Sequence, residues 1–419
     1  MFEQYKINNQ TNLFLVPQPD AQSVTVLVMY PVGSRYEKEK LAGVSHFIEH
    51  LMFKGTKKRP STLILTREID RLGAEYNAFT SKEYTGYYIK TASKYLEISL
   101  DILSDMLINS QFAEKEMLKE KNVIVEELRM YKDNPLLYIE NLFENLMFAG
   151  CALGRDIGGL EKTVLGLPRA EVLKYRDNFY APENTYIAVA GAVNKKTKKL
   201  VEKYFDQRGD RAIGDRRYDS ASFGKEEKSK RIRVEKKKTD QVQLMLGFPG
   251  FAYNNPYNPT IAVLDTILGG TMSSRLFIEI REKRGLAYMI RSGEENYRDS
   301  GYLSVRIGLE AKNINQAIAV TRNEIAKVIN KGVTAKELQD AKTHLRGALT
   351  LSLEASSAQA SWYLSQAMFM KEIKTPEEKL KEIDLVSNAN IKSVARQVFD
   401  FNKMRVAVIG DIEKEKIKF

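Results

Sequence analysis

The sequence has few of the residues that crosslink a chain or anchor it in a membrane. Its 419 residues include a single cysteine, Cys151, which excludes a disulfide within the chain and is compatible with a reducing compartment. No uninterrupted apolar stretch approaches the ~20 residues that a membrane-spanning helix needs. The first residues contain no basic segment followed by an apolar run, so no signal peptide is expected. These absences predict a cytoplasmic protein with no membrane partner.

Histidine is also scarce, with three residues in the chain, whereas lysine and arginine are abundant. The formal net charge of +11 could indicate an anionic partner. Most of the lysines are scattered among acidic residues, however, and no recognised nucleic-acid-binding motif is present. The charge is more typical of a solvated surface, so we expect no nucleic-acid partner. The length and the 43% apolar content indicate a globular protein of about two domains.

Two of the three histidines lie in one short amphipathic segment, residues 44–52. At ~100° per residue, His46, Glu49 and His50 fall on the side of a helix opposite its apolar residues. Those apolar residues are Val44, Phe47, Ile48, Leu51 and Met52. Two histidines at positions i and i+4 can both bind one metal ion, and the glutamate between them can reach water at that ion. The alternative, a surface helix with incidental histidines, is disfavoured because histidine is so rare elsewhere.

A catalytic zinc ion usually takes three protein ligands, so these histidines need one more ligand from elsewhere. Residues 114–130 have a helical apolar period and carry several glutamates. Glu120 and Glu127 lie seven residues apart, on one face of that helix. The pattern alone leaves Glu120, Glu126 and Glu127 open as the third ligand.

The chain repeats itself. Residues 24–33 correspond to 241–250 at an offset of 217, and residues 186–191 correspond to 405–410 at an offset of 219. This predicts two similar α+β domains from an internal duplication, each with a mostly antiparallel sheet covered by helices. We place the first domain at residues 1–208, a linker at 209–239 and the second domain at 240–419. At the offset of 217, the metal-binding residues map to Val263, Thr266 and Ile267, so the second domain is expected to lack the metal site.

The run Gly43-Val-Ser-His-Phe-Ile-Glu-His-Leu-Met-Phe-Lys-Gly-Thr56 resembles the inverted-zinc-motif metallopeptidases. That family includes pitrilysin, insulin-degrading enzyme and mitochondrial processing peptidase, and the chain is most similar to its short bacterial members. Further matching segments extend the resemblance over nearly the whole chain. They are Gly154-Arg-Asp-Ile-Gly-Gly159, Phe179-Tyr-Ala-Pro-Glu-Asn184, Gly269-Gly-Thr-Met-Ser-Ser-Arg-Leu-Phe277 and Arg281-Glu-Lys-Arg-Gly-Leu-Ala-Tyr288.

The resemblance implies one zinc ion per chain, bound by His46, His50 and Glu127. The family's third ligand lies about 75 residues beyond the second histidine, and here 76 residues separate His50 from Glu127. Glu120 matches a family glutamate that supports the ligands, and we expect it to do the same. Manganese or cobalt could occupy the same ligand set.

The resemblance also implies where a peptide substrate binds. Asn77 and Ala78 match a family segment, Asn-Ala-x-Thr, whose strand edge hydrogen-bonds the substrate backbone. Arg281 and Tyr288 match a family pair thought to hold the substrate and to stabilise the tetrahedral intermediate. Without the resemblance they would be interpreted as an exposed helix arginine and a core tyrosine.

Together these residues predict a zinc metalloendopeptidase with Glu49 as its general base. The alternative is a non-catalytic peptide-binding or assembly subunit of the same fold, but every motif residue is intact. Processing peptidases often carry acids just after the third ligand, whereas this chain has Leu128-Arg-Met-Tyr-Lys132. We therefore expect cleavage of short unfolded peptides rather than strict presequence processing.

The resemblance also bears on assembly. In relatives of double length the zinc site lies on one half-shell and the Arg/Tyr pair on the other. This chain has the length of one half-shell and carries both features. We expect a homodimer in which Arg281 and Tyr288 serve the zinc site of the other protomer.

Overall fold

The computed structural model describes residues 2–8, 10–206, 218–223 and 227–419. They form two compact units, each built on one β-sheet. The first unit comprises Met1–Arg129, Arg155–Tyr218 and Ser352–Ile373; the second comprises Met130–Gly154, Asp219–Leu351 and Lys374–Phe419. Both halves of the sequence therefore contribute to each unit.

The sheet of the first unit has six strands in the order β1-β2-β6-β3-β5-β4. The strands are β1 (Glu3–Lys6), β2 (Asn12–Pro17), β3 (Ser23–Tyr30), β4 (Glu75–Thr80), β5 (Thr85–Ala92) and β6 (Tyr186–Gly191). Strands β2 and β6 are parallel, and the other neighbours are antiparallel. β3 lies between β6 and β5, where Val26 pairs with Val189 and with Ile89. Its apolar, β-branched sequence suits this buried central position.

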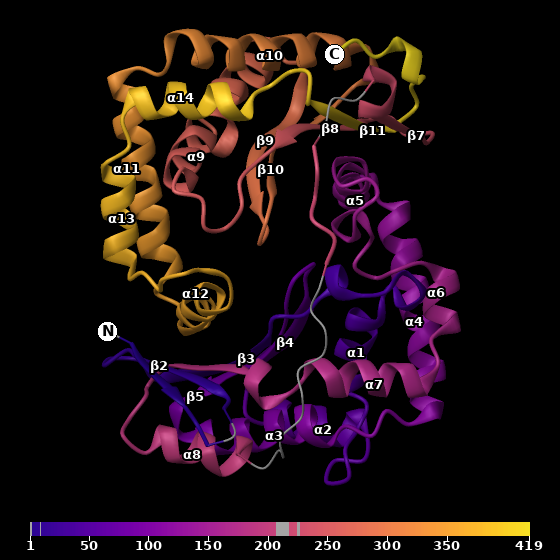
Figure 1. Cartoon of the computed structure of the whole chain (residues 1–419), viewed down its shortest axis with the longest axis vertical. Coiled ribbons are helices and arrows are strands. Elements are labelled where there is room, and N and C mark those ends of the chain that lie inside the picture. The colour runs from indigo at the N-terminus through magenta and orange to yellow at the C-terminus, as the bar shows by residue number, and fades with distance from the viewer. Residues whose placement is uncertain (1, 9, 207–217, 224–226) are drawn as a thin grey trace. The chain divides into compact units, whose positions relative to one another are not determined.

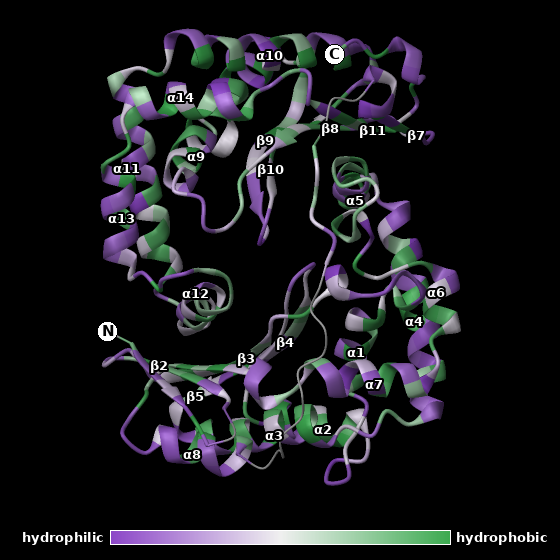
Figure 2. Ribbon diagram, viewed as in Figure 1, coloured by the Kyte–Doolittle hydropathy of each residue, from purple (hydrophilic) through white to green (hydrophobic). Residues whose placement is uncertain are grey.

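Helices cover both faces of this sheet. The helices of this unit are α1 (Val44–Met52), α2 (Thr62–Asp70), α3 (Leu96–Asn109), α4 (Glu114–Asp133, whose end belongs to the second unit), α6 (Glu161–Gly166), α7 (Arg169–Phe179), α8 (Thr197–Phe205) and α12 (Ser356–Phe369). In Figure 1, α3 lies on one face and α12 on the other. Val26, Phe47 and Leu103 share one buried apolar cluster on the α3 face. Figure 2 shows β3 and α3 as largely hydrophobic, and α8 as largely hydrophilic.

The sheet of the second unit has five strands in the order β7-β11-β8-β10-β9. The strands are β7 (Ile232–Lys236), β8 (Val242–Pro249), β9 (Ala287–Asn296), β10 (Gly301–Leu309) and β11 (Arg405–Gly410). The helices are α5 (Pro135–Met147), α9 (Asn258–Asp265), α10 (Ile314–Lys331), α11 (Ala335–Ser352), α13 (Pro376–Asp384) and α14 (Asn388–Val398). Two π-helical segments, Thr266–Gly270 and Phe277–Glu282, follow α9. Short 3-10 turns occur in both units, at Ser34–Tyr36, Glu39–Leu41, Ser93–Tyr95, Ala152–Gly154, Pro182–Asn184, Lys228–Arg231, Ala311–Asn313 and Lys414–Lys416.

The two sheets confirm the predicted duplication. The order β7-β11-β8-β10-β9 repeats the order β2-β6-β3-β5-β4, and the one parallel pair in each sheet is at the equivalent place, β7 with β11 and β2 with β6. Strand β1 is the addition in the first unit. The segments aligned at offsets of 217 and 219 form equivalent strands, β3 with β8 and β6 with β11. Each unit is thus a mostly antiparallel sheet covered by helices.

The units differ from the contiguous domains 1–208 and 240–419 that the sequence suggested. Residues 130–154, including α5, belong to the second unit, where Phe143 and Ile139 pack with Met245 of β8. Residues 352–373, including α12, belong to the first unit, where Ser356 is hydrogen-bonded to Thr25 of β3 (Oγ–Oγ1, 2.8 Å). The segment expected to be a linker, 209–239, contains strand β7; its residues 209–217 and 224–226 lie outside the described residues.

A membrane-spanning segment is not found among the helices of the described residues, because none is both long enough and apolar enough.

Candidate metal centre

Helix α1 begins at a backbone conformation that favours glycine. Gly43 has φ +96°, and a Cβ atom there would lie 2.5 Å from the carbonyl oxygen of Gly158. Because Gly43 has no side chain to cap the helix, Glu37 does so. Its buried carboxylate accepts hydrogen bonds of 2.8 Å from the backbone N–H groups of Gly43 and Ser45. Burial raises the pKa of Glu37 to about 7, although the two N–H donors oppose the shift. The capping carboxylate and the glycine together fix where α1 begins.

The apolar face of α1 is buried against the sheet, as the sequence predicted, so its polar face carries the histidines. The Nε2 atoms of His46 and His50 lie 3.8 and 3.5 Å from Oε2 of Glu127 on α4. One ligand atom from each of these residues lies within 4.8 Å of the other two. Ligands arranged tetrahedrally around zinc at ~2.0–2.1 Å are ~3.3 Å apart. The donor set therefore fits zinc after a small contraction.

The histidines are in a state suited to metal binding. Burial, helped by the neighbouring His50, lowers the pKa of His46 to about 3. His46 is therefore neutral near pH 7, and a metal ion does not have to displace a proton from it. Nδ1 of His50 lies 3.2 Å from Oε2 of Glu120, which leaves Nε2 of His50 directed toward Glu127. A hydrogen bond on the far ring nitrogen is the usual way to orient a metal-binding histidine.

Glu120 is in turn held by a residue that the sequence did not single out, Lys54. Lys54 lies in the first turn beyond the end of α1, and its Nζ lies 2.7 Å from Oε1 of Glu120. Burial alone would raise the pKa of Glu120, but the bonds from His50 and Lys54 hold this pKa below its usual value. Glu120 is thus an anion over the neutral pH range. The one signal for Lys54 was its place within the motif-bearing run 43–56.

Glu49 lies beside this cluster without being part of it. Its Oε2 accepts a hydrogen bond of 2.5 Å from Oγ1 of Thr80, at the end of β4. Burial raises the pKa of Glu49, and the bond from Thr80 opposes the shift. A carboxylate with a raised pKa next to a metal site is suited to accept and return a proton. Thr80 is the threonine of the Asn-Ala-x-Thr segment, but no pattern in the sequence connects it with Glu49.

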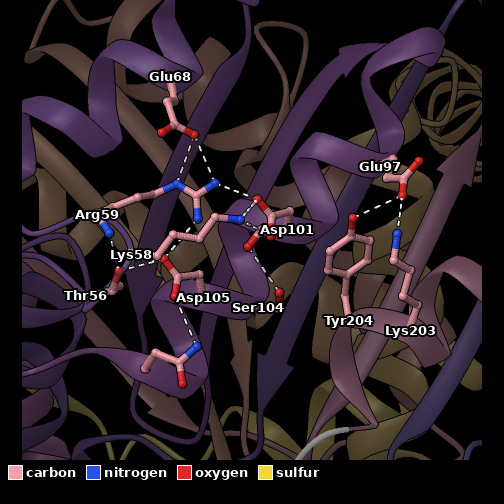
Figure 3. Close-up of polar contacts among 11 residues, drawn as sticks. Thr56, Lys58, Arg59, Glu68, Glu97, Asp101, Ser104, Asp105, Lys203 and Tyr204 are labelled. Carbon is pink, nitrogen blue, oxygen red and sulfur yellow. Dashed lines mark hydrogen bonds and ion pairs between the residues drawn. The ribbon is translucent and has the colours of Figure 1, made fainter.

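The loop after α1 is held by an ion network centred on the buried Arg59 (Figure 3). Its guanidinium nitrogens lie 3.0 Å from Glu68 on α2, and 2.6 and 2.9 Å from Asp101 and Asp105 on α3. Thr56 in the same loop donates a hydrogen bond of 2.6 Å to Asp105. Because Lys54 lies in this loop, the network also fixes the position from which Lys54 reaches Glu120.

Comparison with known proteins decides the family. The family model Insulinase (Peptidase family M16) matches residues 13–159, and the model Peptidase M16 inactive domain matches residues 166–345. The "Uncharacterized zinc protease YmxG" of Bacillus subtilis is 35% identical over 402 residues, covering 95% of this chain and 96% of that protein. The chain belongs to peptidase family M16. An uncharacterized zinc protease of Streptomyces coelicolor is 33% identical, covering 95% of this chain and 87% of that protein.

A solved structure shows the same M16 fold. It is a protease from Helicobacter pylori, with a TM-score of 0.92 and 22% identity, covering 98% of this chain and 99% of that one. The family also accounts for the second half of the chain. Val263, Thr266 and Ile267, the counterparts of the metal-binding residues, offer no imidazole or carboxylate, and they lie in the part that matches the inactive-domain model.

Asn77 and Ala78, whose expected role in binding the substrate backbone stays a prediction, lie on β4 at the edge of the first sheet. They pair with Tyr88 and Tyr87 of β5, and the opposite side of β4 has no neighbouring strand among the described residues. The backbone N–H of Ala78 donates a hydrogen bond of 2.9 Å to the side chain of Asn77. A peptide added to this edge has to replace that bond if it uses the same N–H group.

The remaining M16 pair, Arg281 and Tyr288, lies in the second unit, whereas the residues that cluster as metal ligands lie in the first. Arg281 lies in the π-helical segment Phe277–Glu282, and its guanidinium lies 4.8 Å from the ring centroid of Phe277. Tyr288 is the second residue of β9, and its Oη accepts a hydrogen bond of 3.0 Å from Gln243 of β8. The roles expected for both residues stay predictions.

Proposed function

We propose that the chain is a zinc-dependent endopeptidase that binds one ion through His46, His50 and Glu127. One observation carries this proposal: a neutral imidazole, a second imidazole oriented by Glu120 and a carboxylate converge at the polar face of α1. A further carboxylate, Glu49, lies beside them. The zinc-protease names of relatives that are 33–35% identical over most of the chain support the choice of metal and of reaction.

The chemistry divides between the ion and the protein. Zinc, when bound, activates water and polarises the peptide carbonyl. Glu49, held by Thr80, accepts the proton of the attacking water and returns it to the leaving amine. Glu120 and Lys54 keep His50 oriented throughout. Arg281 and Tyr288 donate hydrogen bonds to the substrate as negative charge develops on its carbonyl oxygen.

The edge strand β4 supports the proposed substrate class. An extended peptide can add to a sheet edge through main-chain hydrogen bonds, but a segment already folded into another structure cannot. We therefore assign short or unfolded peptides as substrates. Leu128 and Arg129, rather than acids, follow the third ligand, so a preference for arginine-bearing presequences is not expected.

We also propose a homodimer in which Arg281 and Tyr288 of one protomer serve the metal site of the other. The duplicated unit that carries this pair lacks metal-binding residues of its own, at positions 263, 266 and 267. The dimer thus gives each copy of the duplicated unit a separate task.

The direct test combines metal analysis with peptide cleavage. The purified chain is expected to contain close to one zinc ion per chain and to cleave a fluorogenic unfolded peptide. A chelator should abolish cleavage, and zinc should restore it. The same peptide sequence held in a stably folded domain is the matched control and should resist cleavage. Stoichiometric zinc without any cleavage across a varied peptide library would favour the non-catalytic subunit instead.

A further inference from the structure

Tyr288 occupies an irregular position in the second sheet. Where β9 pairs with β10, Ala287 is opposite Leu309 and Met289 is opposite Gly308, so Tyr288 between them has no partner. This is a β-bulge, which bends the strand and redirects the side chain of the extra residue. Tyr288 is 45% exposed, so its hydroxyl-bearing ring is accessible from one side.

The redirected ring lies on Gly308 of β10. A Cβ atom at position 308 would come within 2.4 Å of Cε1 and 2.6 Å of Oη of Tyr288. Any side chain at 308 would therefore displace the phenol. Gly293 on β9 is different, because a Cβ atom there would meet nothing within 4 Å. The space above Gly308 is thus a specific seat for the ring of Tyr288.

Across Gly308 the phenol reaches a third strand. The strands lie in the order β8-β10-β9 (Figure 1), and Gly308 is paired with Gln243 of β8. Nε2 of the buried Gln243 donates a hydrogen bond of 3.0 Å to Oη of Tyr288. A phenol has one hydrogen to donate. Because its oxygen already accepts from Gln243, that hydrogen is free to point away from the sheet.

A positive charge lies on the same face. Arg306 precedes Gly308 by two residues on β10, and it interacts electrostatically with Glu140 of α5 first and with Tyr288 second. Among the described residues, its buried Nε and Nη2 atoms have no hydrogen-bond acceptor. The carboxylate of Glu140 offsets part of this charge, so polarisation of the phenol by Arg306 is a minor contribution to its strength as a donor.

We propose that Gln243 and Gly308 are positioning residues for Tyr288. Gly308 gives the ring its seat, and Gln243 fixes the phenol oxygen as an acceptor, so that the hydroxyl hydrogen is presented outward to the carbonyl oxygen of a bound peptide. This proposal rests on the peptidase function, since it makes Tyr288 a donor to the substrate. The geometry itself can be tested without any activity.

The geometric test uses the full chain with 3-fluorotyrosine at position 288 alone, observed by fluorine NMR. Gln243→Leu removes the donor, and Gly308→Ala fills the seat, so each should move the resonance. Gly293→Ala, the matched glycine control, should leave it in place. If neither Gln243→Leu nor Gly308→Ala moves the resonance in a folded protein, the positioning role is overturned. An inactive wild-type chain would refute the proposed function but would leave this result intact.

The kinetic test uses Gln243→Glu, which preserves the size of the side chain. An ionised carboxylate only accepts, so it should take the hydroxyl hydrogen that Tyr288 otherwise offers to the peptide. We expect kcat to fall by about 10²-fold, as for loss of an oxyanion donor in Tyr288→Phe, with little change in KM. Gln243→Leu, which loses one hydrogen bond, should lower kcat by about 10-fold.

A double-mutant comparison separates positioning from general damage. In a Tyr288→Phe background there is no hydroxyl to orient, so adding Gln243→Glu should cost no further activity. An equal loss of kcat with and without the hydroxyl would overturn the proposal, and so would a Gln243→Glu variant that keeps wild-type kcat.

Discussion

Replacing Glu127 with glutamine is expected to remove most of the bound zinc, while the same change at the adjacent Glu126 should do little. The two side chains lie next to each other in sequence on α4 but in different surroundings. Glu127 is 28% exposed and faces both histidines, whereas Glu126 is 72% exposed and pairs with Arg129 at 2.7 Å. The pair therefore provides a control matched in residue type, helix and charge.

The size of the effect follows from the number of ligands. Structural zinc sites contribute roughly 10–16 kcal/mol, and an even division over four ligands gives about 2.5–4 kcal/mol for one, or ~10²–10³-fold in affinity. Glu120→Gln removes a supporting contact rather than a ligand, and should lower affinity by about 10–100-fold. Glu126→Gln should change affinity by less than about 2-fold, because exposed ion pairs contribute little.

The assay is competition for zinc with a chromogenic chelator, together with urea unfolding of the metal-free proteins. Equal free energies of unfolding for the Glu126→Gln and Glu127→Gln proteins would show that any loss of zinc is local. The assignment fails if Glu126→Gln removes the metal and Glu127→Gln retains it. It also fails if Glu120→Gln costs more affinity than Glu127→Gln.

Three further expectations concern other parts of the chain. Burial, and then the nearby Asp265, raises the pKa of Glu294 to about 7, so the folded state keeps a proton that the unfolded state releases above pH ~4.5. The free energy of unfolding should thus fall by up to about 3 kcal/mol between pH 4.5 and 7, and Glu294→Gln should remove this pH-dependent contribution. If urea unfolding shows that Glu294→Gln changes the free energy of unfolding equally at pH 5 and pH 8, this expectation is contradicted. Arg59→Met, which leaves three carboxylates without their buried partner, should cost about 3–5 kcal/mol, against less than about 1 kcal/mol for the exposed Arg129→Met; equal costs would refute a structural role for the network. Mixing Glu49→Gln chains with Tyr288→Phe chains should recover roughly a quarter of wild-type activity, because half of randomly exchanged dimers are mixed and each has one intact site. No recovery despite proven exchange would exclude pairing between protomers.

The local structure around the metal site could be predicted because it depends on residues close together in sequence. The apolar period of residues 44–52 predicted the helix now seen at Val44–Met52, and the recurrence of residues 24–33 at 241–250 predicted equivalent segments, now seen as β3 and β8. The duplication was visible because two buried strands recur at nearly constant spacing. The choice of Glu127 over Glu126 needed the family resemblance, since the helical period of α4 does not fix which neighbour faces α1.

The contacts that complete the site were not predictable in the same way. Lys54 reaches Glu120 across 66 positions of sequence and Thr80 reaches Glu49 across 31, so both contacts depend on tertiary folding. The exchange of α5 and α12 between the units was also hidden. An apolar helix face specifies that a sheet is to be covered, but it does not specify which of two similar sheets.

The central claim is that Glu49 accepts a proton from the attacking water and is not itself a ligand of the zinc ion. The most direct measurement is turnover by Glu49→Gln protein whose zinc content has been measured in the same sample. Glutamine has almost the same size but cannot accept the proton, so we expect full zinc loading, normal peptide binding and a loss of turnover of at least about 10²-fold. A zinc-loaded Glu49→Gln protein that cleaves peptide at close to the wild-type rate would contradict the mechanism.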